Sequence, residues 1–271
     1  MSRKRRPSPE CPKSRHDLYT LSHDFISGHR IPPHSHAEHQ LVYASKGVMT
    51  VHTPAGMWVI PAHRGVWVPA RTVHSIDISG AVSMRTLYFS PRVAASVDRG
   101  CRALTIRPLL RELILHTVGI GVLSRRNPEH ARLIEVMLDQ LEVASTAALH
   151  LPQPKDARAR RIGQLLHDDP CDPRGLEEIA RWAGASERTI QRLFLTETGL
   201  TFGKWRQQLR LVRSLPLLAG GDKVTSVALD VGYDSLSAFV SAFRKAFGVT
   251  PGRYFDEPPA TRIATSNKGV A

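Results

Sequence analysis

The sequence predicts a multidomain α and β protein, with an N-terminal β-barrel of the jelly-roll type and a C-terminal all-α domain. Residues 17–92 hold short segments rich in β-branched and aromatic residues, separated by Gly, Pro and Ser turn signals. From residue 155 to about 254, apolar residues recur at helical spacing between short breaks. With 271 residues, of which 42% are hydrophobic, the chain is long enough to pack two domains.

Charge and cysteine content narrow the class of protein. The formal net charge of +13 favours a polyanionic partner, because clustered cations release counterions from phosphate. Three widely spaced cysteines without a CxxC pair predict neither a disulfide framework nor a cysteine zinc site. No apolar run approaches the ~18 residues of a membrane span, and no apolar segment follows the basic N-terminus. We therefore expect a cytoplasmic protein with no membrane partner.

Composition and periodicity divide the chain into segments. We expect a disordered basic arm over 1–16, a β-domain over 17–104, a helical linker or dimerisation segment over 105–151, a helical domain over 155–258 and a disordered tail over 259–271. Residues 151–154 are interpreted as a linker. Apolar stripes at helical spacing in the third segment either pack on the barrel or form a dimer surface, and they comprise Leu109, Leu110, Leu113, Ile114, Leu133, Ile134, Met137, Leu138 and Leu141.

A first helix-turn-helix unit is predicted between Leu176 and Phe194. Gly184 stands where the first helix must end, because glycine tolerates the left-handed turn between the helices. Ser186 is the expected N-cap of the second helix. That helix presents Glu187, Arg188, Gln191 and Arg192 outward. Arg and Gln are the side chains that bond guanine and adenine edges in the major groove.

A second unit follows between Val224 and Phe247, with Gly232 in its turn and Ser235 as the expected cap. Phenylalanines recur every four residues and are predicted to be core: Phe239, Phe243 and Phe247. The outward positions are Leu236, Ser237, Val240, Ser241 and Arg244, with Lys245 nearby. Apolar side chains at two of these positions can contact a thymine methyl but cannot hydrogen-bond a base.

These residues resemble the DNA-binding domain of the AraC/XylS family of bacterial regulators. The resemblance runs from Leu176 through Tyr254 and is strongest at Gly232-Tyr233 and in the stretch from Ala242 to Pro251. It implies seven helices, with a long helix from about Phe202 to Leu218 joining two recognition helices that enter successive major-groove segments.

By position in the motif, the resemblance implies that the first unit reads bases with Arg188, Gln191 and Arg192. The second-unit positions hold Leu236, Ser237, Val240 and Ser241, and the implied phosphate contacts are Arg244 and Lys245. Ser241 stands where family members often have Arg, and Gly175 stands where a Ser or Thr cap is usual. We expect the first unit to carry most of the base specificity.

The N-terminal half resembles a cupin barrel, as sensor domains of the AraC/XylS family often do. The matching elements are His34, His36, Gln40, Gly47, Pro61, Gly65 and His74. Two imidazoles spaced by one residue are expected on one face of a strand. Four residues are candidate ligands of a divalent transition metal: His34, His36, His74 and Gln40. Cupins usually carry Glu at the last of these positions. A metal-free cupin core is the alternative.

Aromatic residues of the barrel suggest an effector pocket or ordinary core. The expected walls include Tyr43, Trp58, Val59, Trp67 and Val68, with Val66 and Trp67 on opposite faces. The expected function is that of a sequence-specific transcription regulator, not an enzyme, whose sensor binds a small molecule or metal. Its expected partners are double-stranded operator DNA, RNA polymerase and a second copy of the chain. A metal-dependent cupin oxygenase with a DNA-binding appendage and a non-specific nucleic-acid binder are the alternatives.

Overall fold

The computed structural model describes residues 16–255 apart from 63, 98–99 and 145–149. The arm predicted over 1–16, except His16, and the tail predicted over 259–271 lie outside the described residues. The strands are β1 Leu18–Phe25, β2 Arg30–His34, β3 His39–Thr53, β4 Gly56–Pro61, β5 Arg64–Val68, β6 His74–Phe89, β7 Arg102–Thr105, β8 Val122–Leu123 and β9 His150–Pro152. The helices are α1 Pro108–Ile120, α2 Pro128–Glu142, α3 Ala157–Asp168, α4 Leu176–Trp182, α5 Glu187–Thr198, α6 Phe202–Ala219, α7 Val224–Asp230, α8 Leu236–Phe247 and the 3-10 helix η1 Pro251–Arg253.

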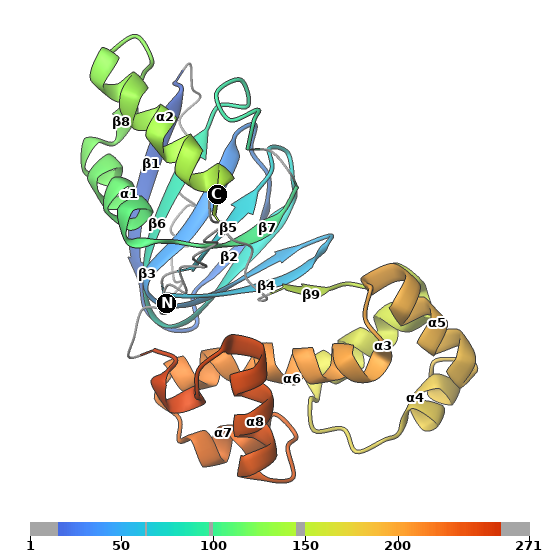
Figure 1. The fold of residues 1–271 in the computed structure, drawn as a ribbon. Helices are drawn as coiled ribbons and strands as arrows, with labels where there is room; N and C mark the ends of the chain where they lie inside the picture. The colour runs from blue at the N-terminus through green and yellow to red at the C-terminus, as the bar shows by residue number, and fades with distance from the viewer. Residues whose placement is uncertain (1–15, 63, 98–99, 145–149, 256–271) are drawn as a thin grey trace, which may run out of the picture.

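Two long antiparallel strands, β3 and β6, form the centre of the N-terminal domain (Figure 1). β5 and β4 pair with one edge of β3, while β1 and β2 pair with β6. The sequence predicted short strands in this region, whereas β3 is one strand of 15 residues with register shifts between Ala44 and Val48. Gly47 makes this irregularity possible, because its φ is +82° and an added Cβ would lie 2.3 Å from the Ala81 carbonyl oxygen.

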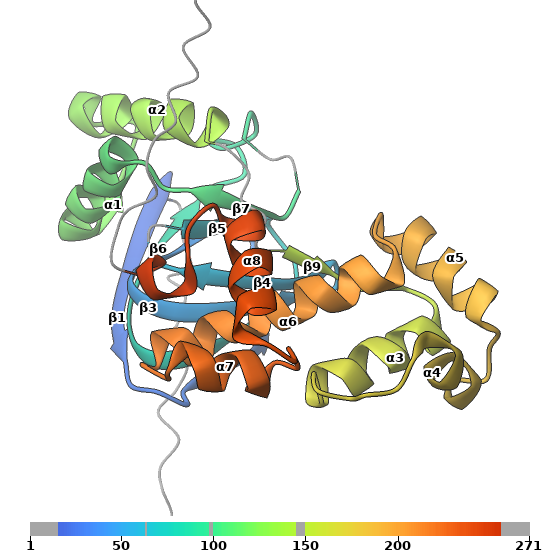
Figure 2. The ribbon, with the colours of Figure 1, turned by 60° about the horizontal axis from the view of Figure 1, so that its bottom comes forward.

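The two helices α1 and α2 cover one side of the sheet (Figures 1 and 2). Four residues of the α2 stripe are fully or almost fully buried: Ile134, Met137, Leu138 and Leu141. Packing on the barrel is therefore confirmed for this stripe. Trp67 and Tyr43 are fully buried in the same core cluster, which agrees with the ordinary-core alternative for these two residues. Val66 belongs to the other cluster, as strand alternation predicted.

The chain passes into the C-terminal domain through a strand rather than a free linker. β9 pairs antiparallel with β4, with Leu151 opposite Met57. The indole Nε1 of Trp205 in α6 donates a hydrogen bond to the Pro152 carbonyl oxygen over 2.8 Å. The predicted linker over 151–154 is thus partly sheet, because its backbone groups find partners on an edge strand that the local sequence does not reveal.

A long helix, α6, joins the two helix-turn-helix units of the C-terminal domain (Figure 2). Its 18 residues span about 27 Å at 1.5 Å per residue, close to the predicted range. α6 also packs against β3, β4, β6 and β9 of the sheet. Of the seven helices implied by the resemblance, the last within the described part of the chain is the short 3-10 helix η1.

The loop between α3 and α4 is hydrogen-bonded to α6. Asp172 is only 3% exposed and accepts from Arg174 Nε over 3.0 Å. From α6, Arg206 donates to the carbonyl oxygens of Arg174 (2.9 Å) and Asp172, and Arg210 Nε donates to that of Pro170 over 3.2 Å. These bonds to guanidinium groups fix the entry to the first unit on the joining helix.

The same loop also reaches the second unit. Cys171 Sγ lies 3.3 Å from the carbonyl oxygen of Leu229 and 3.2 Å from that of Asp230 at the end of α7, so its single S–H proton can be donated to either. In the α7–α8 turn, an added Cβ on Gly232 would lie 2.7 Å from the Pro170 carbonyl oxygen. Since one loop contacts α6 and the turn before α8, it fixes the two units relative to each other.

We predict that Gly232→Ala destabilises the protein more than Gly248→Ala. Both glycines have φ near +84°, at +85° and +83°, so both substitutions carry the left-handed strain. Only Gly232 has backbone within 3 Å of the added Cβ, and that crowding should cost a further ~1–3 kcal/mol. Urea unfolding of the two variants measures the difference, and equal destabilisation would contradict close packing at Pro170.

Candidate functional site

The first helix-turn-helix unit has the local geometry that its sequence predicts. Gly184 adopts φ +75° between α4 and α5, and the Ser186 side chain accepts from the Thr189 backbone N–H over 3.2 Å. Ile190 and Phe194 are fully buried beneath α5. Gly175 before α4 makes no side-chain cap, as glycine must. A capped helix with a buried inner face holds its outer face in a fixed orientation.

The outer face of α5 brings together the predicted base-reading residues. Arg188, Gln191 and Arg192 are all exposed. Arg188 and Arg192 are four residues apart, so they lie on one face of the helix. Gln191 Nε2 donates to the Glu187 carboxylate over 2.8 Å. Glu187 was missed as a site residue, although its i,i+4 spacing to Gln191 could have revealed it, and a carboxylate can accept from the cytosine amino group.

The second unit is packed as tightly but presents different chemistry. Phe239 and Phe243 are fully buried and Phe247 packs against their cluster, so the prediction of an aromatic core is confirmed. The Ser235 side chain accepts from the Ala238 backbone N–H over 3.2 Å, which confirms the predicted cap. The rings of Phe243 and Phe247 lie 4.5 Å apart at an angle of 66°.

The outward side of α8 is short of hydrogen-bonding groups. Leu236 is 43% exposed and Val240 is half-buried, while Ser237 and Ser241 are exposed. Two exposed cations, Arg244 and Lys245, stand in the last turn of the helix. This face offers methyl contacts, two small hydroxyls and positive charge, which suits phosphate and shape contacts better than bidentate base recognition.

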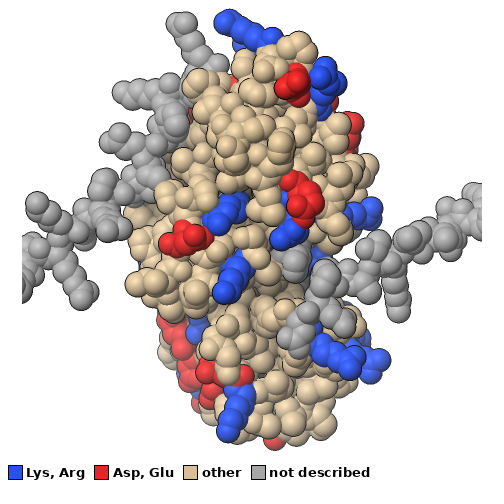
Figure 3. Space-filling model, turned by 90° about the vertical axis from the view of Figure 1, so that its left-hand side faces the viewer, with Lys and Arg blue, Asp and Glu red and all other residues tan. Residues whose placement is uncertain are grey.

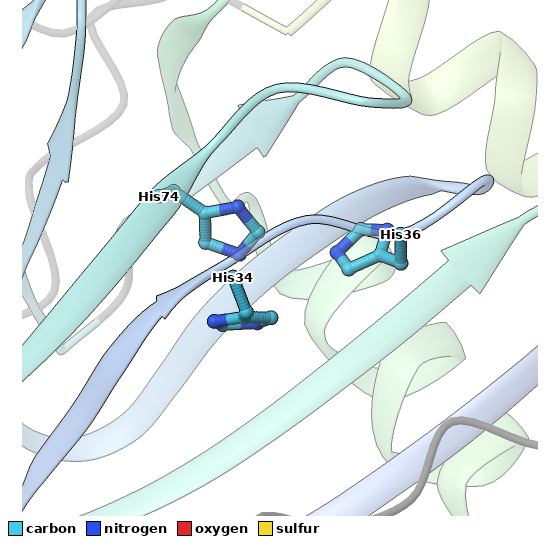
Figure 4. Close-up of side chains that lie close together, drawn as sticks. All are labelled: His34, His36 and His74. Carbon is cyan, nitrogen blue, oxygen red and sulfur yellow. The ribbon is translucent and has the colours of Figure 1, made fainter.

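Three histidines meet at one end of the barrel (Figure 4). One nitrogen from each of His34, His36 and His74 lies within 4.8 Å of the other two. His34 ends β2 and His74 begins β6, where the two residues are paired in register. His36 lies in the loop after β2, so the expectation that both imidazoles stand on a strand was wrong for His36. The loop nonetheless returns His36 to the cluster.

Backbone carbonyls fix the protonation of all three rings. The Nδ1 atoms of His34, His36 and His74 donate to carbonyl oxygens over 2.9, 2.8 and 2.9 Å, because a carbonyl can only accept. Each neutral ring therefore keeps its Nε2 lone pair for another partner. Carbonyl bonds of this kind orient metal-binding imidazoles.

His74 is the most buried member of the cluster. It is 1% exposed, and its Nε2 has no hydrogen-bond partner among the described residues. Burial, together with smaller contributions from the nearby His34 and His36, lowers the pKa of His74 to about 4. The ring is therefore neutral at pH 7, the form that binds a metal ion.

Gln40 completes the cluster in an unusual way. Its Nε2 donates to the Thr86 hydroxyl over 2.9 Å and the Tyr88 hydroxyl over 3.0 Å, which turns its Oε1 toward His36. Oε1 lies 3.0 Å from His36 Nε2. With Nδ1 protonated, two acceptors face each other here, and a shared cation, either a proton or a metal ion, satisfies both. The four residues therefore fit a metal ion as a set of neutral ligands.

His39 does not join this cluster. Its Nδ1 accepts from the Ala70 backbone N–H over 3.2 Å, and its ring stacks on Trp67 at a centroid distance of 5.4 Å. His39 is 4% exposed and alternates along β3 with Gln40, so the two side chains point to opposite faces.

Among the described helices, none combines the length and apolarity that crossing a membrane requires.

Comparison with known families agrees with this architecture. Residues 179–257 match the family described as a Helix-turn-helix domain. Residues 12–164 match the family described as an AraC-like ligand binding domain. The two matches divide the chain in the order that the resemblance implied, a sensor followed by a DNA-binding domain.

Relatives of known function are transcription regulators. NimR of Escherichia coli is 36% identical over 82% of this chain and 81% of its own length, and RipA of Corynebacterium glutamicum is 39% identical over 38% of this chain and 31% of its own. The solved structure of ToxT from Vibrio cholerae covers 88% of this chain and 94% of its own, with 14% identity and a TM-score of 0.38. NimR and RipA are transcription regulators, so they do not support the alternative of a cupin oxygenase. The chain belongs to the AraC family of transcriptional regulators, with a ligand-binding domain followed by a helix-turn-helix DNA-binding domain.

Proposed function

We propose that this regulator recognises specific promoter DNA mainly through α5, while α8 fixes position through methyl and phosphate contacts. The observation that carries the proposal is the exposed row of Arg188, Gln191 and Arg192 on a capped helix. The corresponding face of α8 carries Leu236 and Val240 instead. An Arg that bonds a guanine through both O6 and N7 discriminates against other bases, whereas a phosphate contact does not.

The same proposal assigns the remaining parts of the chain. Residues 17–104 are the cupin-like sensor, 105–151 the helical segment for dimerisation and 155–258 the DNA-binding domain, flanked by the arm and tail. The regulator acts in the cytoplasm on RNA polymerase at the promoter. A ligand of the sensor shifts the equilibrium between two arrangements of the domains. The free energy of that shift equals the difference between its binding free energies for the two arrangements.

A divalent transition metal is proposed at His34, His36, His74 and Gln40. The three Nε2 lone pairs and the 3.0 Å approach of Gln40 Oε1 to His36 support it. Imidazole suits Zn, Cu, Fe and Ni, and a structural metal would tie β2 to β6. Gln40 contributes no negative charge, so we expect weaker binding than a carboxylate would give.

Replacement of Arg192 by Ala should relax base preference rather than only weaken binding. Removal of a bidentate base contact lowers the free energy of discrimination between bases by about 1–3 kcal/mol at the positions it reads. Competition binding at fixed salt, with the operator and with single-base variants of it, measures the change. Arg244→Ala is the matched control, because a variant of α8 without one phosphate-binding cation should bind all sequences more weakly and to the same degree. An equal decrease in affinity for operator and random DNA in Arg192→Ala would contradict the assignment.

Protein purified without a His tag should contain one metal ion per chain. His34→Ala and His74→Ala should each abolish the stoichiometric metal, because each removes one of three imidazole ligands. His116→Ala, on the exposed side of α1, is the control and should retain it. The Gln40→Glu variant should bind the metal ion more tightly than the wild type, because the carboxylate adds a negative charge to the site. Elemental analysis and titration with zinc test all four, and failure of the wild type to bind zinc would support the metal-free core.

Dimerisation is proposed through the sides of α1 and α2 that face away from the barrel. Ile120 is 39% exposed and Val136 42%, and both line a groove between the helices. Uncharged surface is extensive on the face shown in Figure 3, where Lys and Arg are scattered among Asp and Glu. Exposed apolar residues that lie together, as Ile120 and Val136 do in this groove, mark protein interfaces.

Val136→Asp should therefore shift the chain from dimer to monomer, since a charge buried in an apolar interface is costly. Sedimentation equilibrium gives the stoichiometry. Leu229→Asp is the control, because Leu229 is exposed on α7 of the other domain. A wild-type monomer at micromolar concentration would rule this interface out.

A further inference from the structure

An acidic side chain, Glu187, stands in the first turn of α5 beside the cations of the first unit. It is exposed, as are Arg188, Gln191 and Arg192. At about 100° per residue, these four residues form two neighbouring rows with i,i+4 spacing, Glu187 with Gln191 and Arg188 with Arg192. In helix-turn-helix proteins the N-terminal residues of the second helix contact the base edges. Glu187 therefore lies at the end of α5 that contacts bases in this motif.

Glu187 fixes the orientation of the Gln191 amide. Gln191 Nε2 donates to the Glu187 carboxylate over 2.8 Å. Because a carboxylate can only accept, it is the amide nitrogen of Gln191, and not Oε1, that faces Glu187. Oε1 and the second N–H of Gln191 stay available, and a glutamine needs these two groups to bond adenine through N6 and N7. The bond therefore orients Gln191 without occupying its base-reading groups.

The Glu187 carboxylate also keeps acceptor capacity of its own. A carboxylate has about four lone-pair sites, and the bond from Gln191 uses one of them. Glu177 of α4 pairs with Arg181 four residues later, at 2.8 Å, whereas Glu187 has a neutral glutamine at that spacing. Between residues that the structure describes, no ion pair engages Glu187. Its negative charge is therefore not neutralised along the helix.

A carboxylate on a helix that enters the major groove discriminates strongly between sequences. Phosphates repel it, and a base edge satisfies it only by donating a hydrogen bond. Cytosine offers its N4 amino group, whereas guanine and thymine present acceptors and adenine places the N7 acceptor beside its N6 amino group. A charged acceptor that loses water without gaining a donor is costly. Glu187 should therefore lower the affinity for sequences without a suitably placed cytosine, and a group that penalises the wrong sequences increases specificity.

We propose that Glu187 is a specificity-determining residue of the first unit, which accepts from a cytosine amino group and orients the Gln191 amide toward adenine. This inference rests on the proposed function, in which α5 reads bases in the major groove. It adds a negative group to a face on which the proposed function uses Arg188, Gln191 and Arg192. The residue acts on base discrimination at the expense of general affinity for DNA.

Selection of bound sequences from random double-stranded DNA at fixed salt, with the full chain and two variants, tests this proposal. The wild type should prefer cytosine at one position of the half-site read by α5. Glu187→Gln should change that preference to adenine, because an amide bonds adenine through both its groups. Glu187→Ala should lose the cytosine preference and also weaken the adenine preference of Gln191. Both variants should bind random DNA about 3–5-fold more tightly, since one negative charge fewer faces the phosphates.

Asp24→Asn is the matched control, because it makes the same change in net charge at an exposed position on β1 of the sensor. It should select the same sequences as the wild type and bind random DNA equally well. Circular dichroism and the melting temperature establish that each variant is folded. A half-site without a cytosine preference in the wild type, the same preference in both Glu187 variants, or no gain in their affinity for random DNA would overturn the proposal.

Arg192→Ala in the same selection measures the proposed function separately. Relaxed base preference in Arg192→Ala, together with unchanged preference in the Glu187 variants, would contradict only the role of Glu187. Selection of no sequence by the wild type would contradict both.

Discussion

Burial of α6 on several sides at once is the constraint on which the C-terminal half depends. Trp205 and Leu209 are almost fully buried in this helix, and the Trp205 indole also bonds the Pro152 carbonyl at the entry to the domain. α6 therefore packs against the sheet and against both helix-turn-helix units. Any movement of the helix against the sheet would carry α5 and α8 with it, because the loop before α4 is bonded to α6 and to the end of α7.

Local signals were sufficient to predict the helix-turn-helix units. The φ of +75° at Gly184 and the caps at Ser186 and Ser235 each depend on residues within a few positions of one another. The long joining helix was implied by the family resemblance rather than by local signals, and its C-terminal end agrees within one residue. Short-range chemistry of this kind can be read directly from the sequence.

Features set by distant residues could not be predicted in the same way. β9 exists because β4 presents an open edge to it, and Trp67 is core because α1 and α2 cover the side of the sheet to which it points. The histidine cluster was predicted, but the 3.0 Å contact that turns Gln40 toward His36 depends on Thr86 and Tyr88, more than 40 residues away.

The histidine cluster ties β2 to β6 within the barrel, so a metal there would stabilise the sensor itself. Such a metal is suited to a constitutive structural role rather than to a reversible signal.

The central claim is that the two DNA-binding units are unequal. Selection of bound sequences from a pool of random double-stranded DNA by the wild-type chain tests it most directly. The account predicts one half-site with strongly preferred bases, read by α5, and a second half-site about one helical turn away with weak, thymine-biased preference. Two half-sites with equal base preference, or selection of no sequence at all, would contradict it.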